Sequence, residues 1–195
     1  MDFRLATSDD VEEIAEILTL AFLDDPVWGP ALERPGGATD HLDPFWRIYA
    51  EGSLRTGGAY IADGAVALWT PPGETELSDA QEAELMELLR TSFVGDDLAA
   101  LLKLYDRIDS AHPRDVSHAY LGLLATHPRA RGRGIAQQLL AENLRGWDAH
   151  GIPAYLESTN PVNDHRYERA GFRPVGGITA VLSDAHITTM WREPR

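Results

Sequence analysis

The chain has 195 residues, enough for one buried core and too few to indicate two domains, and its formal net charge is −14. This acidic balance argues against a broad nucleic-acid surface, which needs many Lys and Arg contacts to phosphates; it suits a cationic small substrate, although acids that serve only solubility explain it equally well. The absence of cysteine excludes disulfides and cysteine-based zinc sites, and the seven histidines show no metal-binding spacing, so we expect no metal site.

The hydropathy of the chain bears on its location. The start, MDFRLATSDD, lacks the basic and apolar regions of a signal peptide. No run approaches the roughly eighteen apolar residues that a membrane span needs. We therefore expect a soluble, cytoplasmic protein with neither a membrane nor a nucleic acid as partner.

Hydrophobic periodicity and turn residues predict the elements of the first half of the chain. Ile14, Leu18 and Phe22 share one face of a helix whose first turn is acidic, and Asp63-Gly64 is a hairpin turn between two strands. The expected elements are, in order, strand 3–7, helix 8–22, an irregular stretch 24–37, helix 42–55 and hairpin 58–73.

The second half alternates helices and strands, which indicates an α/β domain. Two helices within 78–108 are separated near Gly95, and Gly151 ends a later helix. We expect one α/β domain over 1–195 with about seven strands. The further elements are strand 117–128, helix 132–151, strand 152–159, a short helix 163–170 and strands 172–182 and 186–193.

A cluster of arginine and glycine interrupts the acidic background at HPRARGRGIAQQLL, residues 127–140. It joins a predicted strand to a predicted helix, and because the first N–H groups of a helix have no partner within it, such a junction is typical of an anion site. Arg129, Arg131 and Arg133 add positive charge there. Neither a P-loop nor a dinucleotide-binding turn fits, because no GxxxxGK[ST] occurs and Gln137 replaces the third glycine of GxGxxG.

These residues resemble the acyl-CoA loop of the GNAT superfamily of N-acyltransferases, [Q/R]-x-x-G-x-[G/A]. RGRGIA at 131–136 fits the pattern three residues beyond a Pro, and a second register starting at Arg129 also fits the letters. ESTNPVNDHRYERAGF at 157–172 is similar to a later GNAT segment, in which Asn, Tyr and Gly-Phe follow a strand. A likeness over nearly the whole length, patchy at 30–115, further resembles the puromycin N-acetyltransferase-like members.

The resemblance implies the GNAT fold, which is a mixed central sheet of about seven strands flanked by helices, here with a helical insertion at about 78–108. It also implies acetyl-CoA as co-substrate. In relatives, backbone groups at the end of the central strand hold the pantetheine arm, one N–H supports the thioester oxyanion, and the loop binds the pyrophosphate. The cofactor-binding residues so implied are Leu124, Ala125, Thr126, Arg131, Gly132, Arg133, Gly134, Ile135, Ala136, Gln137, Asn160 and Asn163.

Two residues of the later segment correspond to catalytic positions. Glu157 matches the carboxylate that relatives use as general base, and an ion-pair or solvated strand-end acid is the alternative. Tyr167 matches the general acid that protonates the departing CoA thiolate, and a core tyrosine on the cofactor wall is the alternative.

The expected function is transfer of an acetyl group from acetyl-CoA to a primary amine of a small molecule by direct attack on the thioester. A protein or peptide N-acetyltransferase and a non-catalytic acyl-CoA-binding sensor are the alternatives, and a homodimer is left open. An acceptor pocket could be lined by aromatic residues, with Asp24 or Asp25 as cation anchor. The candidate aromatic residues are Trp28, Phe45, Trp46, Tyr49 and Trp69.

Overall fold

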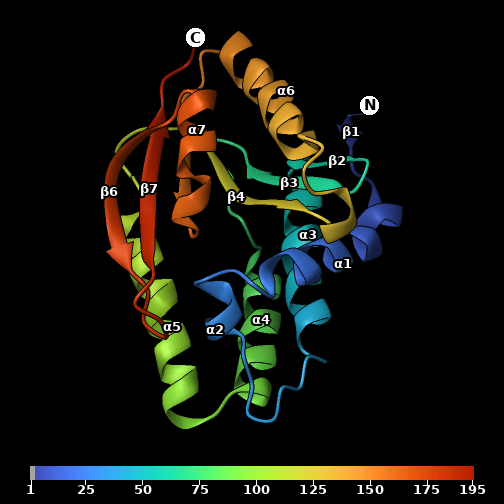
Figure 1. The fold of residues 1–195 in the computed structure, drawn as a ribbon, viewed down its shortest axis with the longest axis vertical. Helices are drawn as coiled ribbons and strands as arrows, with labels where there is room; N and C mark the ends of the chain where they lie inside the picture. The colour runs from blue at the N-terminus through green and yellow to red at the C-terminus, as the bar shows by residue number, and fades with distance from the viewer. Residues whose placement is uncertain (1–2) are drawn as a thin grey trace.

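The computed structural model describes residues 3–195, and over this range seven strands form one sheet in the order β1-β2-β3-β4-β5-β7-β6 (Figure 1). The pair β4–β5 is parallel and the other neighbours are antiparallel. The mixed sheet of about seven strands predicted from the sequence is therefore confirmed. The strands are β1 (Arg4–Leu5), β2 (Ala59–Ala62), β3 (Ala65–Thr70), β4 (Ala119–Thr126), β5 (Ala154–Ser158), β6 (Arg173–Thr179) and β7 (His186–Arg192).

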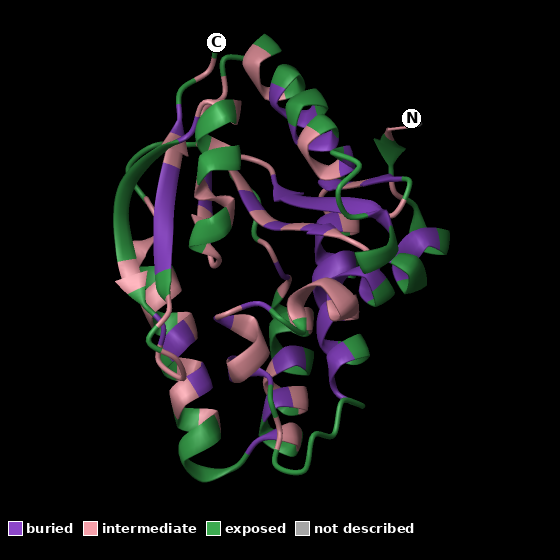
Figure 2. Cartoon of the chain, in the orientation of Figure 1, coloured by how far each residue is buried: buried purple, intermediate pink, exposed green. Residues whose placement is uncertain are grey.

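Helices cover both faces of the sheet, and α4 and α5 extend below it in the view of Figure 1. One apolar cluster lies between the sheet and α1 and α3, and a second between the sheet and α6. The central strands separate the two clusters, so all six residues of β3 are buried (Figure 2). The helices are α1 (Val11–Phe22), α2 (Trp28–Ala31), α3 (Leu42–Arg55), α4 (Asp79–Ser92), α5 (Gly95–Ala111), α6 (Ile135–Ala149) and α7 (Asp164–Ala170).

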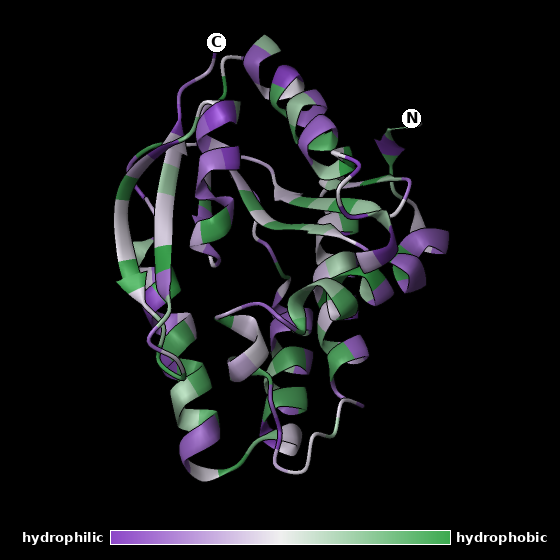
Figure 3. Cartoon of the chain, viewed as in Figure 1, coloured by the Kyte–Doolittle hydropathy of each residue, from purple (hydrophilic) through white to green (hydrophobic). Residues whose placement is uncertain are grey.

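The apolar residues follow the strand and helix periods that place them in these clusters. Figure 3 shows hydrophobic residues along β4, whereas much of α7 is hydrophilic. Helix α1 buries Ile14, Ile17 and Leu18, which lie on one face. None of the helices described over residues 3–195 combines the length and apolar character that a bilayer span requires.

The strands β4 and β5 stop pairing after three residue pairs. Their ladder ends at Leu121 and Leu156, although β4 runs on to Thr126. On its other side β4 has a bulge, because Leu68 and Trp69 of β3 pair with residues that leave Gly122 out of the register. The sheet is thus opened at its centre, at the level of Gly122.

Local details differ from the sequence-based prediction. The stretch predicted as irregular contains the single turn of α2, which begins where an Asp25 carboxylate oxygen accepts the N–H groups of Val27 and Trp28. Helix α6 begins at Ile135, not at 132, because Gly132 and Gly134 have φ of +79° and +74°, which no right-handed helix accommodates. The two helices predicted near 78–108 are confirmed as α4 and α5.

Candidate active site

A cavity of about 630 Å³, here called the loop cavity, lies beside the free end of β4. Its wall combines the end of that strand, the 131–137 loop and the segment around α7. Of the twelve residues expected to bind the cofactor, eleven line it, and Arg133 does not. The eleven are Leu124, Ala125, Thr126, Arg131, Gly132, Gly134, Ile135, Ala136, Gln137, Asn160 and Asn163.

The backbone of the loop is shaped by its two glycines. Both have positive φ, which costs a residue with a side chain about 1 kcal/mol or more. Gly134 is the N-cap of α6, so the free N–H groups of the first turn are at the loop. The first helical hydrogen bond runs from Gln138 N to Gly134 O at 3.1 Å. The loop therefore offers backbone donors and a helix N-terminus on the cavity wall.

Positive side chains gather at this cavity although the chain is acidic. Arg131 lines it from the loop and donates to the carbonyl of Ala21 at 3.4 Å. Arg166 and Arg169 line it from α7. The sequence analysis identified Arg131 but missed Arg166 and Arg169. The sequence pattern that could have indicated them is their spacing of three residues on the short helix that also carries Tyr167. The cavity suits a polyanionic ligand.

Tyr167 reaches the loop cavity from α7. Its ring packs edge-on against Phe172 with centroids 6.2 Å apart. Burial, with the charges of Asp25 and Asp164 as smaller causes, raises the pKa of Tyr167 to about 12. The hydroxyl thus keeps its proton throughout the physiological pH range.

Glu157 directly follows the last β4–β5 residue pair. Its side chain is 5% exposed, and its Oε1 atom is buried without a hydrogen-bond partner among the described residues. The nearest basic atom in an ion pair is Nδ1 of His112, at 3.7 Å. Glu157 is not on the wall of the loop cavity but lies where the two strands separate.

A second cavity, of about 770 Å³, lies between α3, α4, α5 and the sheet, and we call it the tyrosine cavity. Tyr49, Tyr105 and Tyr120 line it, and the hydroxyls of Tyr49 and Tyr105 are 2.9 Å apart. Burial raises the pKa of all three hydroxyls, so they remain neutral hydrogen-bonding groups. Of these residues, sequence reasoning had named Tyr49 alone.

Glu76 belongs to the same cavity and was missed by sequence reasoning. Its carboxylate lies against Gly122 of the β4 bulge: a Cβ on that glycine would be 2.5 Å from Glu76 Oε1. Burial, and to a smaller extent the charge of Glu157, raises the pKa of Glu76 to about 7. The tyrosine cavity therefore reaches the opened part of the sheet, close to Glu157.

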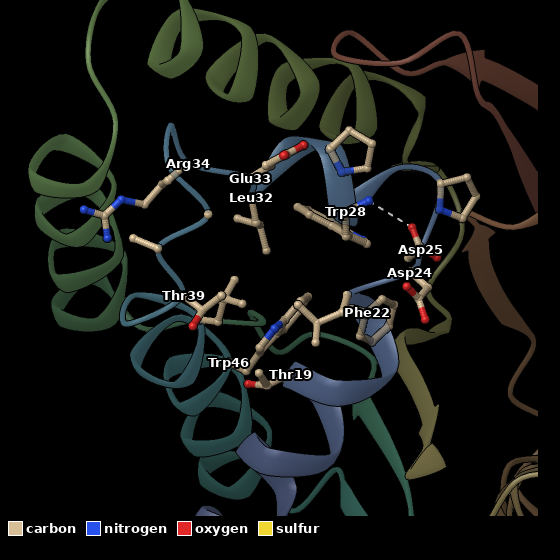
Figure 4. Close-up of a pocket in the computed structure, with 17 residues that line it drawn as sticks. Thr19, Phe22, Asp24, Asp25, Trp28, Leu32, Glu33, Arg34, Thr39 and Trp46 are labelled. Carbon is tan, nitrogen blue, oxygen red and sulfur yellow. Dashed lines mark hydrogen bonds between the residues drawn. The ribbon is translucent and has the colours of Figure 1, made fainter.

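A third cavity, of about 470 Å³, is enclosed by α1, α2, α3 and their connections (Figure 4). Trp28, Trp46, Asp24 and Asp25 line it, as Figure 4 shows, and it has no strand residue in its wall. Asp25 accepts from the backbone of α2 and from Thr159 Oγ1 at 2.7 Å. Asp25 is therefore a structural hydrogen-bond acceptor with both oxygens occupied, and not a free cation anchor.

The aromatic residues proposed for one acceptor pocket do not line a common cavity, although the rings of Trp28, Phe45, Trp46 and Tyr49 contact one another. Phe45 and Trp46 of α3 are 0% and 1% exposed, and their rings meet edge to face in the core. Trp69 faces α6 on the opposite side of the sheet, where its Nε1 donates to Asn143 at 3.0 Å. The prediction of one aromatic acceptor pocket was therefore wrong. The sequence does not distinguish an aromatic ring buried in the core from one that lines a pocket, because both follow the same helical spacing.

Comparisons with known proteins agree with this architecture. The family model described as an acetyltransferase (GNAT) domain matches residues 74–175. An acetyltransferase of Agrobacterium fabrum is 33% identical over 136 residues, which are 61% of this chain and 96% of that protein. The chain therefore belongs to the GNAT family and is an acetyltransferase.

Solved structures share the fold at low identity. A Corynebacterium glutamicum protein, described as histone acetyltransferase HPA2 and related acetyltransferase, has a TM-score of 0.73 at 22% identity, with 99% of this chain and 96% of the other covered. Arylalkylamine N-acetyltransferase 2 from Aedes aegypti has a TM-score of 0.70 at 17% identity, with 100% and 99% covered. The GNAT fold thus extends over the whole described chain.

Proposed function

We propose that this acetyltransferase moves the acetyl group of acetyl-CoA to the primary amine of a small molecule by direct attack of the amine on the thioester. The observation that carries the proposal is the position of Glu157 and Glu76 at the opening between β4 and β5. The loop cavity lies along the end of β4, and the tyrosine cavity reaches the same strand at Tyr120. Donor and acceptor therefore approach one point of the sheet from two cavities.

The loop cavity is the proposed acetyl-CoA site. Its arginines and the N-terminus of α6 suit the pyrophosphate, and the backbone of Leu124, Ala125 and Thr126 suits the pantetheine arm. A free N–H at the strand end would stabilise the oxyanion that forms when the amine adds to the thioester. Acetyl-CoA supplies the activated acetyl group, and the residues of the chain orient it.

Glu157 and Tyr167 are proposed to move the protons. An ammonium group cannot attack a carbonyl, so the buried, unpartnered Oε1 of Glu157 takes a proton from the amine. Tyr167 donates its proton to the leaving thiolate. Its pKa of about 12 makes this donation unfavourable to a thiolate in water, but the burial that raises the pKa of Tyr167 also makes a thiolate bound beside it more basic.

Two alternatives stand beside this proposal. A protein or peptide acetyltransferase would place a longer acceptor in the tyrosine cavity between α3, α4 and α5, and a peptide acceptor in the assay separates it from the proposal. A sensor that binds acyl-CoA without turnover has no use for two carboxylates at the opening of the sheet, of which Glu157 Oε1 is buried without a hydrogen-bond partner. The likeness to puromycin N-acetyltransferases stays a prediction about the acceptor.

A thiol-release assay tests the proposed function. Acetyl-CoA is incubated with the protein and with a panel of small primary amines that includes puromycin, and with a lysine-containing peptide as comparison. We expect thiol release with one or more small amines and less with the peptide. Release with the peptide alone would support the protein acetyltransferase, and tight acetyl-CoA binding without release for any acceptor would support the sensor.

A further inference from the structure

We propose that the tyrosine cavity binds an acceptor with a single cationic head and an apolar body, and that Glu76 pairs with its ammonium group. This inference rests on the proposed function and names the substrate class of its acceptor site. The cavity volume of about 770 Å³ is within the range of small-molecule sites.

Two carboxylates with few partners lie close to this cavity. No hydrogen bond or ion pair joins the Glu76 carboxylate to another described residue, and Glu157 Oε1 lacks a hydrogen-bond partner, with Nδ1 of His112 at 3.7 Å as its ion-pair neighbour. Holding two negatively charged carboxylates close together and away from water costs free energy, unless a cation binds beside them or one of them is protonated. A primary ammonium group placed beside Glu76 and facing Glu157 supplies that cation.

Gly122 provides the space that this arrangement needs. Because the bulge glycine has no Cβ, the Glu76 carboxylate can lie directly against β4. The loop that carries Glu76 is also fixed: Arg55 donates to the carbonyl of Thr75 at 2.6 Å, and a Cβ on Gly52 of α3 would overlap the Glu76 carbonyl. Glu76 is therefore held at the opened part of the sheet by its surroundings, before any ligand binds.

The hydroxyls of Tyr49, Tyr105 and Tyr120 interact with Glu76, and side chains of α4 and α5 form a separate apolar wall of the cavity. Leu85 and Leu89 of α4 are 7% and 1% exposed, and Met86 and Leu102 complete this wall. Such a surface contacts an aliphatic or aromatic body, and burying it from water stabilises the complex.

A second cation on the ligand would find few free partners. Asp109 pairs with Arg114, and Glu74 lies 3.8 Å from Arg55. Glu82 is exposed to water at the rim, where ion pairs contribute little. We therefore assign a monoamine to this site, in preference to a polyamine.

Matched amines and matched variants test the assignment. We expect kcat/KM for 2-phenylethylamine and hexylamine to exceed that for 1,6-diaminohexane about ten-fold or more, since the second ammonium group would be buried against leucine. Glu76→Gln should raise KM for the monoamines about ten-fold or more and change kcat less. Gly122→Ala, which displaces the carboxylate, should do the same. Glu84→Gln, an exposed change of equal charge on α4, is the control.

The outcomes separate this inference from the proposed function. No thiol release with any amine would defeat the proposed function. Release with an unchanged KM in Glu76→Gln, or a preference for the diamine, would overturn the acceptor assignment and leave the acetyltransferase activity intact. Thermal unfolding of each variant, measured beside the kinetics, confirms that a raised KM belongs to a folded protein.

A chain of hydrogen-bonding groups on the wall of the tyrosine cavity carries a second inference. We infer that His112 and His118 conduct the amine proton from Glu157 to solvent. Nδ1 of His112 is 3.7 Å from Glu157 Oε1, Nε2 of His112 is 3.1 Å from Nε2 of His118, and Nδ1 of His118 is 2.7 Å from the carbonyl of Val116. The first contact is longer than a hydrogen bond, as catalytic contacts often are before substrate binds.

The carbonyl of Val116 fixes the proton positions along this chain. It can only accept, so Nδ1 of His118 holds a proton and Nε2 of neutral His118 is free to accept. The Nε2 of His112 must then be the donor between the rings, which leaves its Nδ1 free to take a proton from Glu157. The first two transfers each form one N–H bond, and break an O–H bond at Glu157 and an N–H bond at Nε2 of His112. In the last transfer the Nδ1–H of His118 leaves the carbonyl of Val116 and gives its proton to water, which breaks an N–H bond and forms an O–H bond.

Both rings are held by their neighbours. His112 packs edge-on against Tyr120 and Tyr155, and His118 packs against Trp191. The charged groups that face His118 are Glu157, Arg114 and His112 itself. Burial is the main cause that lowers the pKa of His118, so the ring is neutral near pH 7 and able to accept a proton.

Chemical rescue tests the proton path. His118→Asn should lower kcat for a strongly basic amine about ten-fold with little change in KM, and added imidazole should restore much of the loss. The loss should be smaller for an amine whose pKa is near neutrality. His112→Gln should behave alike, and His150→Asn, on the surface at the end of α6, is the control. A loss that imidazole does not restore, or that is equal for both amines, would overturn the path and leave a structural role.

Discussion

Glu157 and Glu76 show how differently two carboxylates of one site can be held. Glu157 is on a strand, 5% exposed and 3.7 Å from a histidine. Glu76 is on a loop against Gly122, and its pKa is raised to about 7 by burial and by Glu157. Sequence motifs pointed to Glu157, but no motif includes Glu76, because its place depends on a glycine 46 positions later in the chain.

Replacing Glu157 by Gln should slow the reaction most for strongly basic amines at low pH. These amines are protonated there and depend on a base, whereas an amine with a pKa near neutrality is already partly deprotonated. The measurement is thiol release against pH for one amine of each kind. An equal loss for both amines at every pH would assign Glu157 to binding and not to proton transfer.

Tyr167→Phe keeps the ring against Phe172 and removes the hydroxyl. If Tyr167 protonates the thiolate, kcat should fall about one hundred-fold, which corresponds to roughly 3 kcal/mol of barrier, and acetyl-CoA affinity should change little. Titration with acetyl-CoA beside turnover separates the two effects. Full activity would remove Tyr167 from the mechanism, and a loss of affinity alone would make it a wall of the cofactor site.

Glu76→Gln should stabilise the fold at alkaline pH. A carboxyl whose pKa is about 7 when folded and 4.5 when unfolded binds more protons in the folded state, so the native protein loses stability as pH rises between these values. The amide does not titrate. Its gain in unfolding free energy should therefore be larger at about pH 8 than at about pH 5.5, by on the order of 2 kcal/mol.

Urea unfolding at the two pH values measures this difference. Glu84→Gln, which changes an exposed carboxylate on α4, should show no comparable pH dependence. A gain in Glu76→Gln that is equal at both pH values would mean that the pKa of Glu76 is not raised in the folded protein.

At the scale of elements, the 131–137 loop was predictable and α2 was not. The loop combines a preceding strand, two glycines and a helix start, and each is a local property of the sequence. Helix α2 is one turn long and depends on Asp25, whose other oxygen is held by Thr159. Because Asp25 and Thr159 are 134 positions apart, no local sequence pattern indicates their contact, and residues 24–37 were therefore predicted to be irregular.

Gly134→Asp tests the role of the loop. The substitution puts a side chain at φ +74° and a negative charge at the start of α6, where a phosphate would bind. We expect acetyl-CoA affinity to fall about ten-fold or more, measured by titration. Gly146→Asp, on the same helix with open space around its Cα, is the control for added charge. Unchanged affinity in a folded Gly134→Asp protein would place the cofactor elsewhere.

At the scale of the molecule, the candidate site is built around the point where β4 and β5 stop pairing. The strand order and the helices could be expected from period and family resemblance, and they agree with the structure. The acceptor residues could not, because α3, α4, α5 and the 71–78 loop meet only through long-range packing. Phe45, Trp46 and Tyr49 are neighbours on α3, but Phe45 lies in the core, Trp46 also lines the third cavity and Tyr49 lines the tyrosine cavity.

The fate of the acetyl group gives the most direct test of the account. Acetyl-CoA labelled with ¹³C in its acetyl group is incubated with the protein and 2-phenylethylamine, and the amine is analysed by mass spectrometry beside the released thiol. We predict one labelled amide for each thiol released, with little product from Glu157→Gln or Tyr167→Phe. Thiol release without labelled amide would mean hydrolysis and not transfer, and would contradict the meeting of donor and acceptor at the opening of the sheet.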